Sequence, residues 1–383
     1  MPNSIDRATI ALRYLGKAVA IASLALAAFL AGPPTASADD DGGIRLVTQN
    51  MYVGTSFAAL TAAQTPDQLR AAVATIYNNI VASKPAERAA AMAREIARHR
   101  PDLIALQEAA VLRTGNGGPA TTVRPATTVR SDLVQLLLDE LAGLGQRYVA
   151  VAIIPGTDAQ GPSLLGFDVR VTIQDAILVR AEIETSNLQI EQFGVKLTLQ
   201  SPLGTFADTR GWAAIDVNMR GRRFRFVTTH LDSSVPAIRV AQARELLLTA
   251  ANTSLPVVMA GDFNIAADTS LDPSFPAYQA MINAGFTDAW LSKRAPDPGF
   301  SCCQAGNLLN PTSQLSHRID LVLFRGAFGV SDISLIGNQP ADRTGSGLWP
   351  SDHAGVAATL RLPSRQADNR KPTASTDSAV RNS

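Results

Sequence analysis

The chain has 383 residues, of which 46% are hydrophobic and 17% are charged, and its formal net charge is +1. This composition excludes a disordered chain, which would be poor in apolar residues and rich in charge. Two cysteines are too few for a disulfide-stabilised scaffold. A net charge near zero argues against a partner held mainly by a basic surface, but it does not exclude nucleic acid as a substrate.

The N-terminal segment has the three parts of a secretory signal. Basic residues precede an apolar run over 18–32, and an Ala-Ser-Ala sequence at 36–38 supplies the small residues that a signal peptidase reads. The alternative, a short transmembrane helix, is disfavoured because the run is shorter than the ~20 residues that span a bilayer. We therefore expect residues 1–38 to be removed and the mature protein to be secreted and soluble.

The segment after the signal alternates strands and helices, and the polar residues 364–383 are expected to form a disordered tail. The apolar patterns predict strands at 44–50, 103–106, 147–154, 173–183, 213–218, 224–231, 256–260, 319–324 and 356–362, and helices over 65–100 (divided at Pro85), 131–144, 237–251 and 278–284. Residues 184–206 are predicted to form a β-hairpin. Such alternation indicates an α/β fold with helices covering the sheet faces.

A six-residue sequence, PATTVR, occurs twice in tandem, at 119–124 and 125–130. We interpret the repeat as a loop that tolerates insertion, because loop tips accept such changes. The functional alternative is a loop that contacts substrate, since the repeat follows Glu108 closely.

Polar residues stand at or beside the ends of many of the predicted strands. They are Asn50, Glu108 in LIALQE, His230 in FVTTHL, Asp262 and Asn264 in GDFN, Asp320 in HRID, and Asp352 and His353 in PSDHAGV. Strand ends are where side chains converge in a crevice. Carboxylates in such a place suit a hard divalent cation, because Mg²⁺ prefers oxygen ligands, while Asn and His can donate to phosphate oxygens.

The motifs QE, THL, GDFN, RID and SDH, in this order, resemble the endonuclease/exonuclease/phosphatase superfamily. Its members include secreted deoxyribonucleases, apurinic-site endonucleases, neutral sphingomyelinases and inositol polyphosphate 5-phosphatases. The resemblance runs from residue 50 to residue 353, so we expect 39–363 to form one catalytic domain. It implies a four-layer αββα sandwich of two packed mixed β-sheets flanked by helices.

The resemblance also implies a metal site. Glu108 matches the main metal ligand of the family, Asn50 matches the Asn of the first strand beside the metal, and Asp352 matches a carboxylate near it. The expected cofactor is Mg²⁺, with Mn²⁺ as an alternative.

The same resemblance implies the catalytic residues. Asp262 matches a carboxylate that orients or deprotonates the attacking water, and Asn264 matches a phosphate contact. His353 matches a phosphate-binding or proton-transferring His that Asp320 orients, and His230 matches a second catalytic His. A carboxylate fixes the tautomer of a His and raises its basicity. Whether Asp262 or His353 is the base stays open.

These residues predict a secreted, metal-dependent phosphodiester hydrolase, and a nuclease is our first choice. The substrate is expected to be nucleic acid or a phospholipid headgroup, with no stable protein partner and a monomeric state. A sphingomyelinase-like enzyme would need exposed apolar residues in 184–206 to reach a bilayer. A phosphatase acting on an inositol or sugar phosphate could use the same residues. A non-enzymatic binding module is disfavoured because no motif residue is missing.

Two other features have competing interpretations. The arginines within 220–225 resemble a nucleic-acid patch, but the strand that follows places their turn about 20 Å from His230, so we expect a solvated hairpin tip; Arg210 is better placed, on the side of the motifs. Cys302 and Cys303 could form a vicinal disulfide, two free thiols or an intermolecular bridge.

Overall fold

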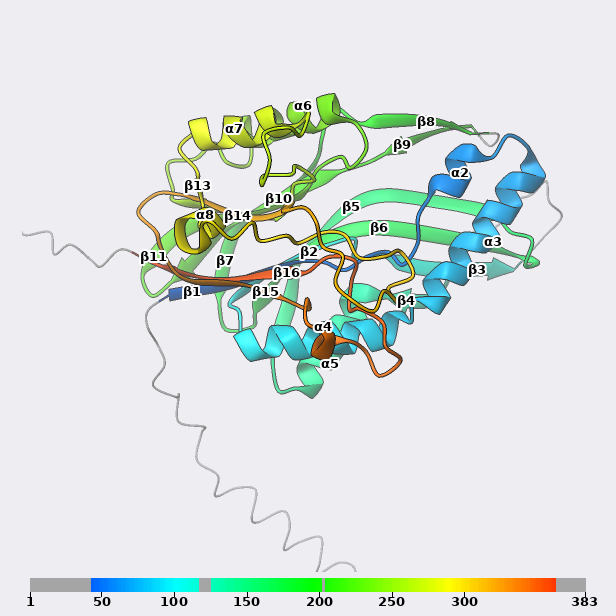
Figure 1. The fold of residues 1–383 in the computed structure, drawn as a ribbon, viewed down its shortest axis with the longest axis horizontal. Helices are drawn as coiled ribbons and strands as arrows, with labels where there is room; N and C mark the ends of the chain where they lie inside the picture. The colour runs from blue at the N-terminus through cyan, green and yellow to red at the C-terminus, as the bar shows by residue number, and fades with distance from the viewer. Residues whose placement is uncertain (1–42, 117–124, 202–203, 363–383) are drawn as a thin grey trace, which may run out of the picture. The chain divides into compact units, whose positions relative to one another are not determined.

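The structure is a computed structural model that describes residues 43–116, 125–201 and 204–362. Within these ranges, two large β-sheets pack face to face and helices cover their outer faces (Figure 1). The predicted secretory signal at 1–38, the first PATTVR copy at 119–124 and the predicted tail at 364–383 lie outside the described residues.

The first sheet has eight strands in the described part of the chain. They are β1 (Gly43–Asn50), β2 (Leu103–Gln107), β3 (Val111–Asn116), β4 (Thr128–Asp132), β5 (Tyr148–Pro162), β6 (Phe167–Arg180), β15 (Gly329–Ile336) and β16 (Gly355–Arg361). Their order is β15-β16-β1-β2-β6-β3-β4, and β5 pairs with β6. The sheet is mixed because β1 and β2 are parallel, whereas the other pairs are antiparallel.

The second sheet has six described strands. They are β7 (Glu184–Gln192), β10 (Gly211–Met219), β11 (Arg222–His230), β12 (Val257–Asp262), β13 (Thr287–Asp288) and β14 (Asp320–Arg325). They are ordered β13-β14-β12-β11-β10-β7, with β11 and β12 parallel. A separate two-stranded hairpin is formed by β8 (Leu197–Ser201) and β9 (Gly204–Asp208).

The helices begin at residues that suit helix starts. Thr65 and Gln68 form a capping box at the start of α3 (Pro66–Ala82), and Pro85 opens α4 (Pro85–His99). Asp132 accepts the first free N–H groups of the next helix. The remaining helices are α2 (Ala58–Ala62), α5 (Leu133–Gly143), α6 (Pro236–Leu248), α7 (Phe275–Asn283), α8 (Ala289–Arg294) and the 3₁₀ turn η1 (Pro340–Asp342).

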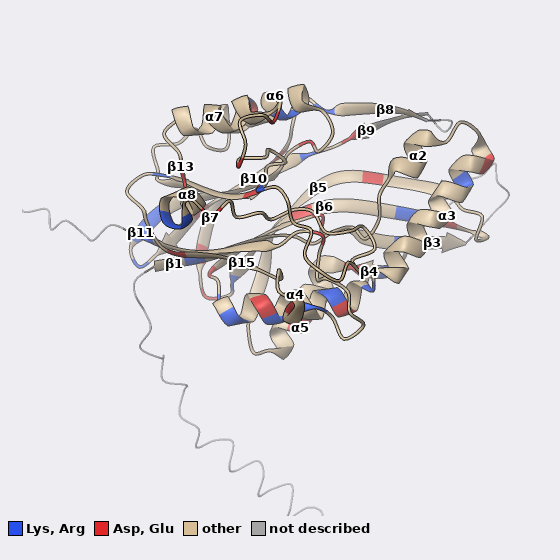
Figure 2. Cartoon of the chain, in the orientation of Figure 1, with Lys and Arg blue, Asp and Glu red and all other residues tan. Residues whose placement is uncertain are grey.

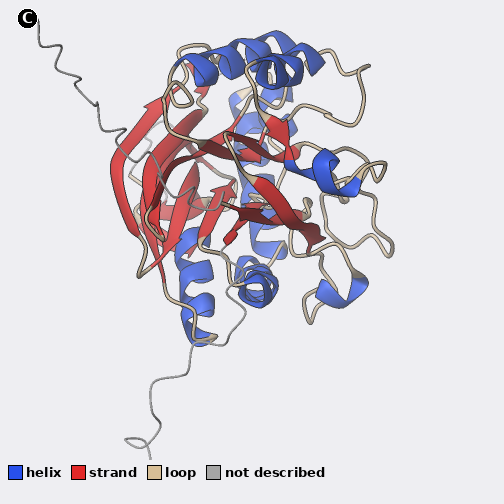
Figure 3. Cartoon of the chain, turned by 90° about the vertical axis from the view of Figure 1, so that its left-hand side faces the viewer, coloured by secondary structure: helices blue, strands red, loops and turns tan. Residues whose placement is uncertain are grey.

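Three apolar cores separate the layers. One lies between the two sheets, one joins α3, α4 and α5 to the first sheet, and one joins α6 and α7 to the second. Figure 3 shows the strands between helices above and helices below. The predicted four-layer αββα sandwich is therefore confirmed. None of the described helices combines the length and apolar character needed to cross a bilayer.

The prediction of one β-hairpin over 184–206 is wrong. β7 pairs with β10 as the edge strand of the second sheet, and only β8 and β9 pair with each other. Phe193, between β7 and β8, is 2% exposed and packs into the core beneath α6 and α7. An alternating pattern predicts strands but does not say which neighbour each one takes.

The loop interpretation of the PATTVR repeat is wrong for part of its second copy. Thr128, Val129 and Arg130 belong to β4, which pairs with β3 at the edge of the first sheet. The substrate-contacting alternative stays a prediction.

Replacing Phe226 tests the core between the sheets. Phe226 is fully buried in that core, so Phe226→Ala should lower the free energy of unfolding by about 3–5 kcal/mol. Leu248 is 74% exposed, and Leu248→Ala should change it by less than about 0.5 kcal/mol. Urea unfolding measures both, and equal losses would contradict the assigned packing.

Candidate active site

The first sheet brings several predicted site residues to one end. Asn50 ends β1 opposite Gln107 of the parallel β2, so the two carboxyl ends meet there, and Glu108 follows directly. β16 runs antiparallel to β1. Its start, just after Asp352 and His353, therefore lies at the same end of the sheet.

The second sheet places three more in a row across neighbouring strands. His230 at the end of β11 is opposite Asp262 at the end of β12, and Asp262 is opposite Asp320 at the start of β14. Asn264 follows two residues later, where its backbone N–H donates to Asp262 Oδ1 at 2.8 Å. Its side-chain nitrogen donates to the carbonyl of Leu231 at 3.0 Å.

A hydrogen bond between the sheets joins the two groups. Asn50 Nδ2 donates to Asp262 Oδ2 at 3.0 Å, and both residues are essentially unexposed. Asn50 Oδ1 accepts the backbone N–H of Tyr52 at 2.9 Å, which fixes the orientation of the amide. The structure thus brings all eight predicted site residues to the edge where the sheets meet.

His353 is held by a buried carboxylate, as expected. Its Nδ1 lies 2.9 Å from Asp320 Oδ2, and its Nε2 lies 4.0 Å from Asp352 Oδ1. Burial lowers the pKa of His353, but Asp320, Asp352 and Asp262 outweigh it and raise this pKa well above its ordinary value. The neighbours of His353 therefore favour its protonated form.

The carboxylates of the site repel one another. Burial raises the pKa of Asp352 to about 7, and the charges of Glu108 and Asp262 add to the rise while His353 and Arg88 oppose it. Glu108 is fixed on both sides: its Oε2 accepts the N–H of Val53 at 2.9 Å, and its own N–H donates to an aspartate.

The donor set suits a hard divalent cation. Two sets of donors lie at this edge. Asp262, Asp320 and His353 offer ligand atoms within 4.8 Å of one another, and Glu108 and Asp352 are the pair that the sequence resemblance implies as metal ligands. In the described chain, Asp320 Oδ1 is buried without a hydrogen-bond partner. Oxygen donors that carry surplus negative charge are the ligands that Mg²⁺ prefers, and a cation at Glu108 and Asp352 would relieve their repulsion.

Arg210 contacts His230 directly. Its Nη1 lies 2.9 Å from Nδ1 and 2.7 Å from Nε2 of the imidazole, and Asp208 pairs with its guanidinium at 3.2 Å. Asp175 and Asp262 lie 3.6 and 3.5 Å from the ring nitrogens. Burial and Arg210 lower the pKa of His230, but the two aspartates raise it above its ordinary value.

A fully buried arginine connects the two loops that carry the site. Arg88 donates to the carbonyls of Met51, Tyr52 and Pro350 at 2.6–3.1 Å. It therefore ties the segment after Asn50 to the segment before Asp352. No motif pointed to Arg88, but it stands four and eight residues before Met92 and Ile96, on the buried face of α4.

Asp175 is the other residue that sequence reasoning missed. It lies within β6, accepts the N–H of Glu108 at 3.2 Å and lies near His230. The available signal was an acidic residue directly before the apolar run 176–179 of the strand, since buried carboxylates are rare unless they have partners.

Cys302 and Cys303 form a disulfide with each other, which decides between the alternatives that the sequence left open. Their segment packs along the site. Gln304 N donates to Asp352 O at 2.8 Å, and Ala354 N donates to Ser301 O at 2.7 Å.

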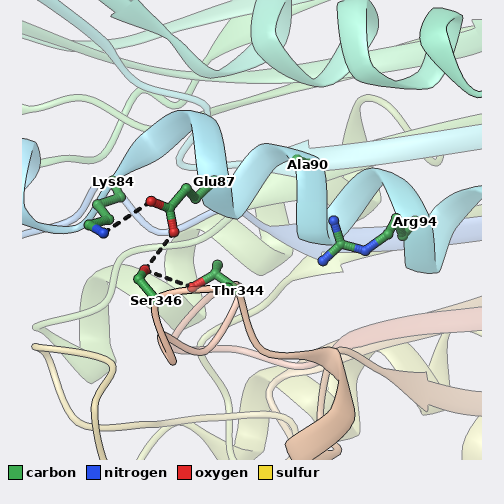
Figure 4. A pocket seen from close by; sticks show the side chains of 7 residues that line it. Lys84, Glu87, Ala90, Arg94, Thr344 and Ser346 are labelled. Atoms are coloured by element: carbon green, nitrogen blue, oxygen red, sulfur yellow. Dashed lines mark hydrogen bonds and ion pairs between the residues drawn. The ribbon is translucent and has the colours of Figure 1, made fainter.

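A hollow of about 430 Å³ lies between α4 and residues 344–346, away from the candidate site (Figure 4). Glu87 there accepts from Ser346 Oγ at 2.5 Å and pairs with Lys84 at 3.0 Å. None of the eight predicted site residues lines this hollow.

Two kinds of comparison identify relatives. Tyrosyl-DNA phosphodiesterase 2 from Mus musculus is 28% identical over 171 residues, which are 40% of this chain and 41% of that protein. The match thus spans less than half the length of this relative.

Solved structures share the fold at low sequence identity. An endonuclease/exonuclease/phosphatase family protein from Leptotrichia buccalis has a TM-score of 0.52 and 16% identity, covering 83% of this chain and 100% of that one. D. rerio TDP2 complexed with single-strand DNA product has a TM-score of 0.51 and 17% identity, covering 84% and 100%. The Bacteroides thetaiotaomicron mannosyl-6-phosphatase has a TM-score of 0.50 and 17% identity, covering 83% and 100%.

The model of one family spans nearly the whole described chain, from residue 47 to residue 353. With the site and the two-sheet sandwich in agreement, the chain belongs to the Endonuclease/Exonuclease/phosphatase family.

Proposed function

We propose that the protein is a divalent-metal-dependent hydrolase of phosphodiester bonds, and that its substrate is nucleic acid. The observation that carries the proposal is the row of His230, Asp262 and Asp320, which Asn50 joins to the end of the first sheet where Glu108 and Asp352 also lie. Family membership supports phosphate-ester chemistry, and the relative named tyrosyl-DNA phosphodiesterase 2 supports a DNA substrate.

Glu108 and Asp352 would hold the cation, with Asn50 beside them. When bound, Mg²⁺ or Mn²⁺ would supply positive charge to the phosphoryl group and stabilise the charge that develops there. The pKa of Asp352 is raised first by burial and then by the charge of Glu108, which supports these two carboxylates as joint ligands of one cation.

Asp262 would accept the proton of the attacking water. It is held in place by Asn50 Nδ2 and the backbone N–H of Asn264. His353 is better suited to donate, because its neighbours favour the protonated imidazole. We therefore assign Asp262 as the base or water-orienting group and His353 as the acid on the leaving oxygen.

His230 and Arg210 would bind the phosphate oxygens next to Asp262. A guanidinium and an imidazole that touch each other, beside a carboxylate, provide donors of fixed orientation. Asn264 would contribute its second side-chain N–H, since the first is bonded to a carbonyl.

The structure gives less support to a phospholipid substrate. Of the apolar residues over 188–197, Phe193 is buried and Ile190 packs against the core between the sheets. Leu188 and Val195 are the large ones left exposed, at 50% and 44%, and two such side chains are few for a bilayer contact.

We further propose that residues 1–38 direct export and are removed, as their three-part pattern indicates. Expression of the full chain in a bacterium should give a secreted product whose N-terminal residue is Asp39. An intact mass that still includes residues 1–38 would contradict the export signal.

Removing the metal ligand tests the reaction. Glu108→Gln keeps the size of the side chain and removes its charge, so cleavage of supercoiled DNA and of bis(p-nitrophenyl) phosphate should fall at least about 100-fold. EDTA should abolish both activities. Glu182→Gln makes the same change at a side chain that is 67% exposed and should leave both rates unchanged. Full activity of Glu108→Gln would sink the proposal.

The raised pKa of Asp352 predicts that the stability of the metal-free protein depends on pH. The folded pKa of Asp352, about 7, lies above its ordinary value of 3.8, so between these values the folded state binds more protons than the unfolded state. Stability should therefore fall as pH rises through this window. In EDTA at pH 8, Asp352→Asn should melt at a higher temperature than the wild type, and the difference should shrink toward pH 5.

Mg²⁺ serves as the control for this prediction. It should raise the melting temperature of the wild type more than that of Asp352→Asn. A variant that melts lower than the wild type at pH 8 in EDTA would contradict the assigned charge crowding.

A further inference from the structure

Two arginines outside the catalytic residues face each other across neighbouring strands. Arg113 of β3 pairs directly with Arg170 of β6 in the antiparallel register. Their side chains therefore stand on the same face of the first sheet. Like charges placed directly opposite destabilise a sheet, so this arrangement calls for a counter-charge.

The face they occupy is the one that carries the active site. Val169 and Val171, on either side of Arg170, pack into the helix-covered core, so Arg170 points the other way. Farther along β6, Ala176 packs into that same core, whereas Asp175 reaches His230. The arginines and the site thus share the face of the first sheet that is turned away from its helices.

One carboxylate pairs with Arg170 and is linked to Arg113 only through a threonine hydroxyl. Asp158 of β5 pairs with Arg170, whose hydrogen bond is the largest influence that lowers the pKa of Asp158. Thr172 donates to Asp158 at 2.8 Å, and Arg113 in turn donates to Thr172 at 2.7 Å. Arg113 therefore bonds a neutral hydroxyl, and one positive charge of the cluster is left over.

The cluster is accessible and lies where the strands continue past the site. The side chains of Arg170 and Asp158 are 36% and 37% exposed. Figure 2 shows an acidic segment on β5 beside a basic segment on β6, in the part of these strands that extends toward α2 and α3. Half-exposed, pre-oriented guanidinium groups are suited to phosphate.

The distance to the site selects the kind of substrate. Thr172 and Arg170 lie three and five residues from Asp175 along β6, which is about 10 and 17 Å at ~3.3 Å per residue. One strand of a duplex carries a phosphate about every 3.4 Å of its axis. A strand with one phosphate at the catalytic residues can therefore place others, about three to five positions away, over the arginines.

We propose that Arg113 and Arg170 form a second phosphate-binding site, which holds the backbone of a DNA strand away from the bond being cleaved. This inference rests on the proposed nuclease function and narrows it to polymeric substrates. A phosphomonoester or a small diester is too short to reach the arginines, so it would gain nothing from them.

The test compares two double variants with equal loss of charge. Arg113→Gln with Arg170→Gln changes the proposed site. Arg222→Gln with Arg223→Gln changes the turn that begins β11, whose first residue is eight residues and about 26 Å from His230. Binding of a fluorescent 15-base-pair DNA duplex (the 15-mer) is measured in EDTA, which prevents cleavage, from 50 to 300 mM NaCl.

The first variant should reduce the slope of log K against log salt by about 0.9 to 1.8, because each phosphate contact to duplex DNA contributes about 0.9. The second variant should keep the wild-type slope. With Mg²⁺, the first variant should raise KM for the 15-mer, leave its kcat unchanged and keep the wild-type kcat/KM for bis(p-nitrophenyl) phosphate.

An unchanged slope for the first variant, or an equal loss in both, would overturn the proposal. So would a parallel loss of small-diester hydrolysis, which would mean that the arginines only support the sheet. Failure of the proposed function has a different signature: the wild type would cleave neither DNA nor the small diester, whatever the result of the binding measurement.

Discussion

The hydrogen bond between Asn50 and Asp262 is the contact on which the rest of the site depends, because it connects two separate sheets at one point. Its 3.0 Å length requires β1 to end level with β12 across the apolar core. Once that register is set, parallel pairing brings Glu108 to one side, and the cross-strand row brings His230 and Asp320 to the other. A shift of one residue in either sheet would turn one partner away.

Burying so many charges in one place is unfavourable, and the fold compensates for it with arginines. Arg88 lies beneath the loops that carry Asn50 and Asp352, and it satisfies their carbonyls while its charge opposes the rise in the pKa of Asp352. Arg210 places a second positive charge beside His230, where Asp208, Glu108 and Asp175 surround it. A divalent cation would neutralise the remaining excess of negative charge, so the same repulsion would lower the stability of the metal-free protein and favour metal binding.

The apolar pattern predicted the alternation of strands and helices, and the resemblance to the family implied the four layers. Polar side chains at strand ends singled out eight residues, which the structure brings to one edge of the two sheets, while their roles stay predictions. The apolar pattern does not say which strands pair with each other, and there the sequence was insufficient. The alternation over 184–206 suits any antiparallel neighbour, so β7 was paired wrongly. β15 was not among the predicted strands, because as an edge strand it carries polar residues that weaken the apolar pattern. Arg88 and Asp175 act through contacts that are distant in sequence, so only the fold reveals them.

The most direct test of this account is a crystal structure of the protein with Mn²⁺, recorded with anomalous diffraction. The account predicts an ion bound by Glu108 and Asp352, at oxygen distances of about 2.0–2.2 Å, with the Asn50–Asp262 hydrogen bond intact. An ion bound instead by Asp262, Asp320 and His353 would contradict it. Glu108 and Asp352 would then have no cation to offset their mutual repulsion.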